Sequence, residues 1–145
     1  KILRVREWFK PSIKAEILFT HIEIVEIDEF KYKRTIYPQG KILMYTGNKE
    51  EAFRILEDLG FEYWFTVYKE WGGLYKLKRL YDKIIALEYV KDLGYSLEVE
   101  IWGSNVEQVK HEMTEILGSL GIKKDKVLWK SLPTIVAEHL KLIRT

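Results

Sequence analysis

Hydrophobic and polar residues alternate at the start of the chain, where Leu3 and Val5 are interleaved with Arg4 and Arg6. Successive side chains of an extended strand point to opposite faces, so this pattern predicts a strand over residues 1–8. Both arginines then lie on one face of the strand, and the two apolar residues lie on the other. The alternation therefore predicts a basic face backed by an apolar one.

Two longer stretches follow the first strand. Residues 13–27 predict one long strand whose alternation slips at Val25-Glu26, as at a β-bulge, with a hairpin tip near Asp28-Glu29. The return strand, residues 32–46, is interrupted by Pro38-Gln39-Gly40, because proline removes a ladder donor and glycine weakens a strand. We expect a bend or a sheet edge at this interruption.

Capping residues and apolar positions at helical spacing predict helices after these strands. The first helix opens at Asn48 and Glu51, which fit the N-cap and third position of a capping box, and it ends at Gly60. Ser104 and Glu107 form the same pattern before a second amphipathic stretch. Both helices are therefore predicted mainly from local signals at their ends.

Between the two helices, residues 62–99 predict a meander of strands with tips near Gly72-Gly73, Asp82-Lys83 and Asp92-Leu93-Gly94. A last helix begins at Ser131-Leu132-Pro133, since proline is tolerated only in a first turn. The order is a strand block, a helix, a second strand block and two helices. This order predicts an α+β fold with an antiparallel sheet or barrel.

Composition narrows the class of protein. The 145 residues have the length of one domain, and we expect residues 1–145 to form it. No apolar run approaches the length of a membrane span, and no signal peptide is visible, so we expect a cytoplasmic protein. The absence of cysteine excludes disulfides, thiolate metal sites and a cysteine nucleophile, and it fits a reducing compartment.

Net charge bears on possible partners. Lys and Arg number 24 against 22 Asp and Glu, which gives +2 and is too balanced for binding to nucleic acid by bulk charge. The run Lys123-Lys124-Asp125-Lys126 is expected to be a solvated turn, and an RNA-contact patch is the alternative that no other feature of the sequence supports. Any site for a polyanion must therefore be local.

A second alternating run, residues 93–101, carries Glu98 and Glu100 on one face and Leu97, Val99 and Ile101 on the other. Two carboxylates separated by one residue can share a divalent cation through oxygen ligands. A solvated outer face is the alternative for this pair, as it is for the two arginines near the start. The residues alone leave both readings open.

Several short segments occur in a recognisable order along nearly the whole chain. They are Leu3-Arg4-Val5-Arg6, Ile17-Leu18-Phe19-Thr20-His21, residues 51–61, Val67-Tyr68-Lys69, Leu87-Glu88-Tyr89-Val90, Leu93-Gly94 and Leu97-Glu98-Val99-Glu100-Ile101. In this order they resemble the CYTH superfamily, the triphosphate tunnel metalloenzymes that include class IV adenylyl cyclases and thiamine triphosphatases. Each motif is short, so the resemblance rests on their order.

The resemblance implies an antiparallel β tunnel of the CYTH type, with a charged inner face and helices packed outside. It implies that a nucleotide or inorganic triphosphate is bound there, and hydrolysed or cyclised if the protein is a metal-dependent triphosphatase or an adenylyl cyclase-like enzyme. The implied phosphate-binding residues are Arg4, Arg6, Lys69, His21 and Lys78. The implied ligands of Mg²⁺ or Mn²⁺ are Glu98, Glu100 and Glu88.

The chain also departs from the family pattern. The family's first-strand Glu-x-Glu-x-Lys motif does not occur, so we expect a missing N-terminal segment or loss of the motif. Residues 41–45 contain no acidic residue, although acidic residues alternate at this place before the helix in the family. His21 occupies the position of a family lysine, and Trp71 occupies that of a family arginine. The alternative is a non-catalytic, degenerate CYTH-like module for a phosphorylated ligand, an RNA end or a protein partner, which Tyr63, Trp64 and Trp71 would face.

Overall fold

The computed structural model describes residues 1–9, 14–27, 30–78 and 83–144. The chain divides into two compact units, Lys1–Trp64 and Phe65–Thr145, and each is described by itself. The predicted tip at Asp28-Glu29 lies outside the described residues, as does Asp82 of the tip predicted at Asp82-Lys83. The prediction of one domain over residues 1–145 stays a prediction.

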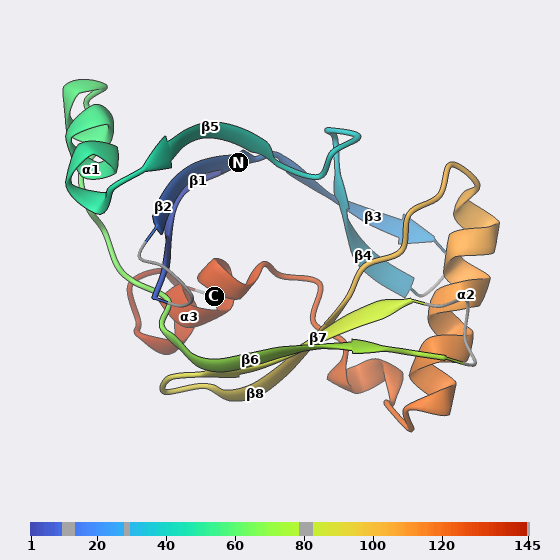
Figure 1. Ribbon diagram of the computed structural model, residues 1–145. Coiled ribbons are helices and arrows are strands. Elements are labelled where there is room, and N and C mark those ends of the chain that lie inside the picture. The colour runs from blue at the N-terminus through green and yellow to red at the C-terminus, as the bar shows by residue number, and fades with distance from the viewer. Residues whose placement is uncertain (10–13, 28–29, 79–82, 145) are drawn as a thin grey trace. The chain divides into compact units, whose positions relative to one another are not determined.

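The first unit is built on a three-stranded antiparallel sheet in the order β1-β2-β5 (Figure 1). Its strands are β1 (Ile2–Trp8), β2 (Lys14–Thr20) and β5 (Ile42–Gly47), and β1 confirms the first predicted strand. In β2 the consecutive residues Ile17 and Leu18 are both buried. Burial on both faces of this strand explains its weak alternation of apolar and polar residues.

The prediction of one long strand over residues 13–27 is wrong, because β2 ends at Thr20 and β3 (Ile22–Ile27) pairs with β4 (Phe30–Thr35) in a separate two-stranded sheet. The break falls at His21, whose backbone carbonyl accepts a hydrogen bond from the amide of Ile36 at 3.1 Å. The β3–β4 register runs without a shift, so the slip predicted at Val25-Glu26 is also wrong.

The interruption predicted at Pro38-Gln39-Gly40 is confirmed, because it separates β4 from β5. The Gly40 amide donates to the Tyr37 carbonyl at 2.8 Å, which closes a turn. Gly40 has φ 79°, a left-handed conformation that glycine adopts without steric cost. Glycine is therefore needed at this turn for its backbone freedom.

Helix α1 (Lys49–Asp58) begins and ends where the capping residues predict. The Asn48 side chain accepts a hydrogen bond from the Glu51 amide at 2.8 Å, and Gly60, with φ 84°, follows the helix end. The Glu51 carboxylate accepts from the Tyr45 hydroxyl at 2.6 Å, so it links the helix to β5. A Cβ atom at position 47 would overlap that hydroxyl, which explains the glycine there.

One face of the β1-β2-β5 sheet packs against α1. Ala15 and Ile17 of β2 and Ala52 of α1 form the buried centre, and each is 0–1% exposed. Ala52 is the only residue of this helix that is fully buried, and its small side chain lets helix and sheet approach closely. Partly buried residues surround this centre: Leu3, Val5, Tyr45, Ile55 and Leu56.

The second unit contains an antiparallel sheet in the order β6-β7-β8 (Figure 1). Its strands are β6 (Lys69–Lys76), β7 (Ile84–Val90) and β8 (Gly94–Val99), whereas residues 62–68 of the predicted meander form no strand. The tip predicted at residues 92–94 is confirmed, with Asp92 at φ 67° and Gly94 at φ 98°. The bounds of β8 leave Glu100 and Ile101 beyond the end of the strand.

The tip predicted at Gly72-Gly73 is wrong, because both glycines lie inside β6. The rings of Trp71 and Tyr75 lie close enough to Gly73 that an added Cβ would be 3.2–3.4 Å from their atoms. These two aromatic side chains fill the space that a side chain at Gly73 would take. The glycine pair therefore serves packing within a strand and not chain reversal.

Two helices complete the second unit, α2 (Val106–Ser119) and α3 (Leu132–His139), with a short 3₁₀ turn η1 (Lys124–Lys126) between them. The capping box predicted at Ser104 and Glu107 is wrong by one residue. Asn105 is the N-cap of α2, and its side chain accepts from the Gln108 amide at 3.1 Å. The buried positions Ile116 and Leu117 confirm the predicted apolar stripe.

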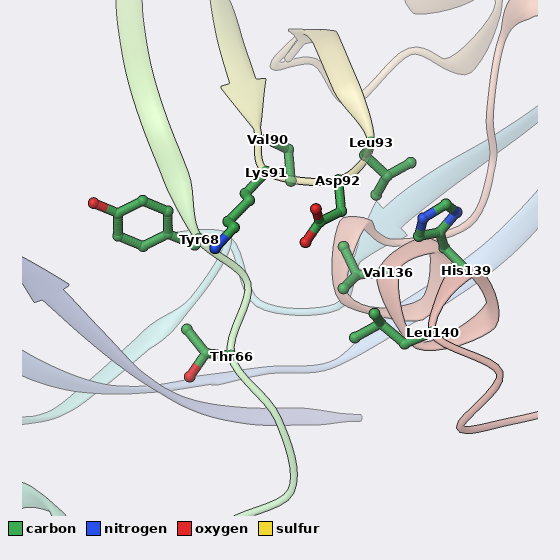
Figure 2. A pocket seen from close by; sticks show the side chains of 9 residues that line it. All are labelled: Thr66, Tyr68, Val90, Lys91, Asp92, Leu93, Val136, His139 and Leu140. Atoms are coloured by element: carbon green, nitrogen blue, oxygen red, sulfur yellow. The ribbon is translucent and has the colours of Figure 1, made fainter.

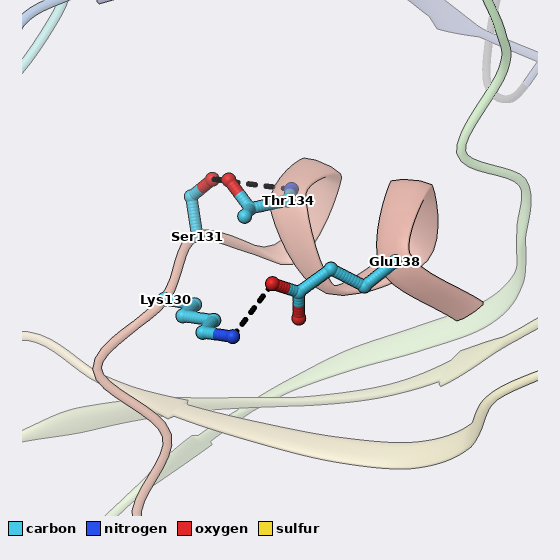
Figure 3. Close-up of polar contacts among 4 residues, drawn as sticks. All are labelled: Lys130, Ser131, Thr134 and Glu138. Carbon is cyan, nitrogen blue, oxygen red and sulfur yellow. Dashed lines mark hydrogen bonds and ion pairs between the residues drawn. The ribbon is translucent and has the colours of Figure 1, made fainter. Parts of the chain in front are cut away.

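The start of α3 is confirmed, since the Ser131 side chain caps it by accepting from the Thr134 amide at 3.3 Å (Figure 3). Lys130 directly precedes the N-cap residue Ser131, and its ammonium donates to the carboxylate of Glu138 at 2.6 Å. This hydrogen bond connects the residue before α3 to the last turn of the helix. Both contacts fix the entry of the chain into this short helix.

The α+β class is confirmed by the observed elements. Within the described residues the three sheets are antiparallel and separate, and none of them closes into a barrel, so the CYTH-type tunnel stays a prediction. Among the same residues, no helix combines the length and the apolar character needed to cross a membrane.

Candidate functional site

The two arginines of β1 lie on the sheet face that α1 does not cover. Leu3 and Val5 pack toward the Ala15–Ile17–Ala52 centre, and the alternation of β1 turns Arg4 and Arg6 to the other side. Both arginines are half-buried. We call this side of β1 and β2 the arginine face, and the structure confirms that its two arginines lie together.

Arg6 lies opposite Glu16 of β2 in the strand register. The Lys14 ammonium donates to the Glu16 carboxylate at 2.8 Å, and this hydrogen bond is the main cause that lowers the pKa of Glu16. Burial opposes the lowering, and a hydrogen bond from Trp8 and the charge of Arg6 add to it. The Arg6 guanidinium also lies 5.4 Å from the centroid of the Trp8 ring. The arginine face therefore combines three cations with one ionised carboxylate.

A second charged face lies on the β6-β7-β8 sheet. Glu88 pairs with Ser96 in the register, and Ala86 pairs with Glu98, so the two carboxylates are diagonal neighbours on one face. Glu88 is half-buried and Glu98 is exposed. We call this side the carboxylate face. Glu100 lies one residue past the end of β8 and is exposed.

Lys69 of β6 contacts the carboxylate face. Its ammonium donates to the Glu88 carboxylate at 2.5 Å, and the two side chains are 40% and 16% exposed. A register shift between Lys69 and Trp71 pairs Lys69 with Val90 but Trp71 with Tyr89. Trp71 therefore points to the other face, and it does not occupy the position beside Lys69 that the family pattern assigns to an arginine.

The other two residues predicted to bind phosphate lie outside the strands. His21 occupies the break between β2 and β3 and is half-buried. Lys78 is exposed in the turn that follows β6. Neither of them is part of the regular row of side chains on a charged face.

The predicted residues thus fall into two groups. Arg4, Arg6 and His21 belong to the unit of residues 1–64, and Lys69, Lys78, Glu88, Glu98 and Glu100 belong to that of residues 65–145. Among the residues that the structure describes, no three or more His, Asp or Glu side chains are grouped to hold a metal ion. A pair of carboxylates still fits Mg²⁺, which proteins often hold through one or two carboxylates with substrate phosphates as further ligands.

The aromatic residues proposed for partner contact are exposed in both units. Tyr63 and Trp64 of the first unit are 66% and 60% exposed, and Trp71 of the second is 45% exposed. The centroid of the Tyr63 ring lies 6.3 Å from the centroid of the Phe53 ring on α1. The prediction of an aromatic patch for a partner stays a prediction.

Sequence reasoning missed a pocket in the second unit (Figure 2). Its volume is about 240 Å³, and it lies between the β7–β8 tip and the end of α3. Lys91 and Asp92 supply its charged side chains, and Tyr68 and His139 supply a phenol and an imidazole. The one local signal for it was the Asp92-Leu93-Gly94 turn, while the contribution of His139 depends on tertiary structure.

Comparisons with family models, with curated proteins and with solved structures found no match to this chain.

Proposed function

We propose that this chain is a divergent CYTH-like module that binds a nucleotide or inorganic triphosphate together with a divalent cation in a charged β tunnel. The observation that carries the proposal is the position of Arg4 and Arg6 on the face that α1 leaves open. A helix packed against one side of the sheet and cations gathered on the other is the arrangement that such a tunnel wall requires.

The arginine face supplies the groups that would hold phosphate. The guanidinium of each arginine presents several N–H donors in a plane, and it can donate two hydrogen bonds to one phosphate group. Their partial burial strengthens such contacts, because the surroundings screen charge less than bulk water does. Arg4 and Arg6 would therefore position the phosphate chain and neutralise part of its charge.

The carboxylate face supplies the groups that would hold Mg²⁺ or Mn²⁺. Glu98 and Glu88 are neighbours on one sheet face, and Glu100 follows at the strand end. A cation bound by them would neutralise charge on phosphate oxygens. For Glu88 to bind it, the carboxylate must exchange its hydrogen bond from Lys69, and the released ammonium is then available to phosphate.

Turnover in such a site would depend mainly on positioning and on charge neutralisation in the transition state. The Arg4 and Arg6 guanidiniums would orient the phosphoryl group and stabilise the charge that develops on its oxygens. Water would be the nucleophile in hydrolysis, and a ribose hydroxyl would be the nucleophile in cyclisation. Hydrolysis is the reaction that we propose first.

A non-catalytic binding module is the second candidate. The pairing of Lys69 with Glu88 favours it, because a predicted phosphate ligand and a predicted metal ligand neutralise each other in this structure. The replacement of acidic residues by residues 41–45 before α1 favours it as well. Such a module would bind the phosphorylated ligand without releasing phosphate.

Thermal unfolding with tripolyphosphate and Mg²⁺ tests the binding. A ligand at 100 times its Kd stabilises the folded state by about 2.7 kcal/mol, which raises the Tm of a chain of this size by several degrees. We expect Arg6→Ala and Glu100→Ala to abolish most of this rise. Arg54→Ala and Glu57→Ala, at exposed positions of α1, are the matched controls. A rise that persists in both test variants would refute the proposed site.

Phosphate release separates the two candidates. Triphosphates of the four nucleosides, thiamine triphosphate and tripolyphosphate are incubated with Mg²⁺ or Mn²⁺. If phosphate is released and Glu100→Ala abolishes this release, the protein is an enzyme. Tight binding of a triphosphate without phosphate release supports the binding module.

A further inference from the structure

The pocket of the second unit has an apolar floor. Leu93 of the β7–β8 tip and Leu140 at the end of α3 supply its accessible apolar surface, at 37% and 44% exposed, while Val90 and Val136 are buried at 1% and 6%. Figure 2 shows these side chains gathered below and beside the β7–β8 tip. A volume of about 240 Å³ is below the range of drug-sized pockets, so the pocket suits a small ligand with an apolar body.

Two opposite charges and an imidazole surround this floor. In Figure 2 the Asp92 carboxylate lies between the Lys91 ammonium and the His139 ring. Lys91 and Asp92 are adjacent in sequence, yet within the described part of the chain their side chains form no ion pair with each other or with a third residue. The pocket thus presents a cation and an anion that are both available to a ligand.

Backbone hydrogen bonds fix the turn that carries Lys91 and Asp92. The Lys91 amide donates to the Tyr68 carbonyl at 2.9 Å, and the Leu93 amide donates to the Val90 carbonyl at 3.1 Å. Asp92 between them has φ 67°, a left-handed conformation that costs most residues energy and that aspartate and asparagine tolerate best. The turn therefore fixes the backbone position from which the Asp92 side chain projects.

We propose that this pocket binds a small zwitterion with an apolar body, of the class of free α-amino acids with an aliphatic side chain. The ligand's carboxylate contacts Lys91, its ammonium group contacts Asp92, and its side chain covers Leu93 and Leu140. None of the residues proposed to bind the triphosphate or its cation lines this pocket, and the inference does not depend on that proposal.

The charges of the pocket argue against simpler ligands. A phosphate or another polyanion would be repelled by the Asp92 carboxylate, and a plain hydrocarbon would remove water from both charged groups without replacing its hydrogen bonds. A zwitterion satisfies the cation and the anion at once. The small size of such a ligand limits its affinity, so we expect a Kd between micromolar and millimolar.

Titration with L-leucine, followed by amide NMR signals of the intact chain, tests this inference. We expect saturable shifts of the Lys91, Asp92 and Leu93 signals at leucine concentrations up to about 10 mM. Two leucine analogues lack one charge each: 3-methylbutylamine has no carboxylate, and 4-methylpentanoate has no ammonium group. Each should bind about tenfold more weakly or worse, because a charge-assisted hydrogen bond is lost.

Substitutions of Lys91 and Asp92 test which of them binds the ligand's carboxylate and which binds its ammonium group. Lys91→Met should weaken leucine about tenfold and leave 3-methylbutylamine unchanged, and Asp92→Asn should weaken leucine equally and leave 4-methylpentanoate unchanged. Asparagine keeps the left-handed turn, so Asp92→Asn changes the charge and not the fold. Lys124 and Asp125 are another adjacent lysine and aspartate, in η1 and outside the pocket. The control variants Lys124→Met and Asp125→Asn should therefore not change leucine binding.

Two results would overturn the inference. One is the absence of saturable shifts with leucine and with other aliphatic amino acids. The other is that 4-methylpentanoate binds as tightly as leucine and that Asp92→Asn does not change leucine binding. This result would mean that the pocket binds only the carboxylate of the ligand. Tripolyphosphate binding, measured in the same variants, should remain unchanged, so failure here is distinguishable from failure of the triphosphate proposal.

Discussion

The Lys69 ammonium meets the Glu88 carboxylate at 2.5 Å across neighbouring strands, 19 residues apart in sequence. The ion pair connects β6 and β7 on the carboxylate face, where Glu98 is the next acidic side chain. It also keeps a cation suited to phosphate and an anion suited to a metal ion engaged with each other. A bound triphosphate with its cation would have to separate them.

Glu88→Gln should free Lys69 and raise the affinity for tripolyphosphate in the absence of metal. An ion pair at this exposure is worth up to about 1 kcal/mol, so we expect an increase of about fivefold. The same variant should reduce the additional affinity that Mg²⁺ confers. Isothermal titration calorimetry with and without Mg²⁺ measures both effects. Glu98→Gln removes the same charge without freeing a lysine, and equal metal-free gains in both variants would contradict the prediction.

Glu112 should make stability depend on pH at the acid end. The Lys83 ammonium, 3.0 Å away, is the main cause that lowers the pKa of Glu112 below its ordinary value of 4.5, while burial opposes the lowering and Gln108 adds to it. The folded state then binds this proton more weakly than the unfolded state. The stabilisation is complete above the unfolded pKa and is lost as the pH falls through the lowered one.

Urea unfolding between about pH 7 and pH 3 measures this effect of Glu112. We expect the free energy of unfolding of the unaltered chain to fall toward acid more steeply than that of Glu112→Gln. Glu70→Gln, at an exposed position of β6, should leave the slope unchanged. Parallel curves for Glu112→Gln and the unaltered chain would show that this ion pair does not control acid stability.

Asn48→Ala should destabilise the first unit through the start of α1. The side chain of Asn48 accepts the Glu51 amide, and removal of such a cap costs about 1 kcal/mol. Asn48→Asp keeps the acceptor for the Glu51 amide, but it loses the hydrogen bond that the Asn48 side chain donates to the Glu51 carboxylate at 3.4 Å and places a like charge beside it. Its stability should therefore lie between those of Asn48→Ala and the original chain. Urea denaturation curves report both, and an unchanged midpoint for Asn48→Ala would contradict the role of the cap.

The sequence predicted those parts of the fold that depend on local signals. Asn48, Gly60 and Ser131 mark helix ends because each acts on backbone groups within a few residues. The alternation of β1 was equally readable, because one of its faces packs on α1 and the other carries the arginines. The resulting order of strands and helices was sufficient to predict the α+β class.

The errors arise where distant contacts decide the structure. The break at His21 was not visible, because residues on both faces of β2 are buried and β3 leaves to pair with β4. Gly72-Gly73 has the composition of a turn, yet aromatic rings beside it keep it in a strand. The Lys69–Glu88 pair depends on the register of β6 against β7, and a bulge sets that register. No short stretch of sequence contains this information.

The proposed function requires that the arginine face and the carboxylate face act on the same ligand. Paramagnetic broadening by Mn²⁺ bound with tripolyphosphate measures this most directly, since the ion broadens only the amide signals near it. We predict that the signals of Arg4, Arg6 and Glu98 broaden together, and that they sharpen again when Mg²⁺ displaces Mn²⁺. Broadening at Glu98 with Arg4 and Arg6 unaffected, in the presence of saturating tripolyphosphate, would contradict a shared site.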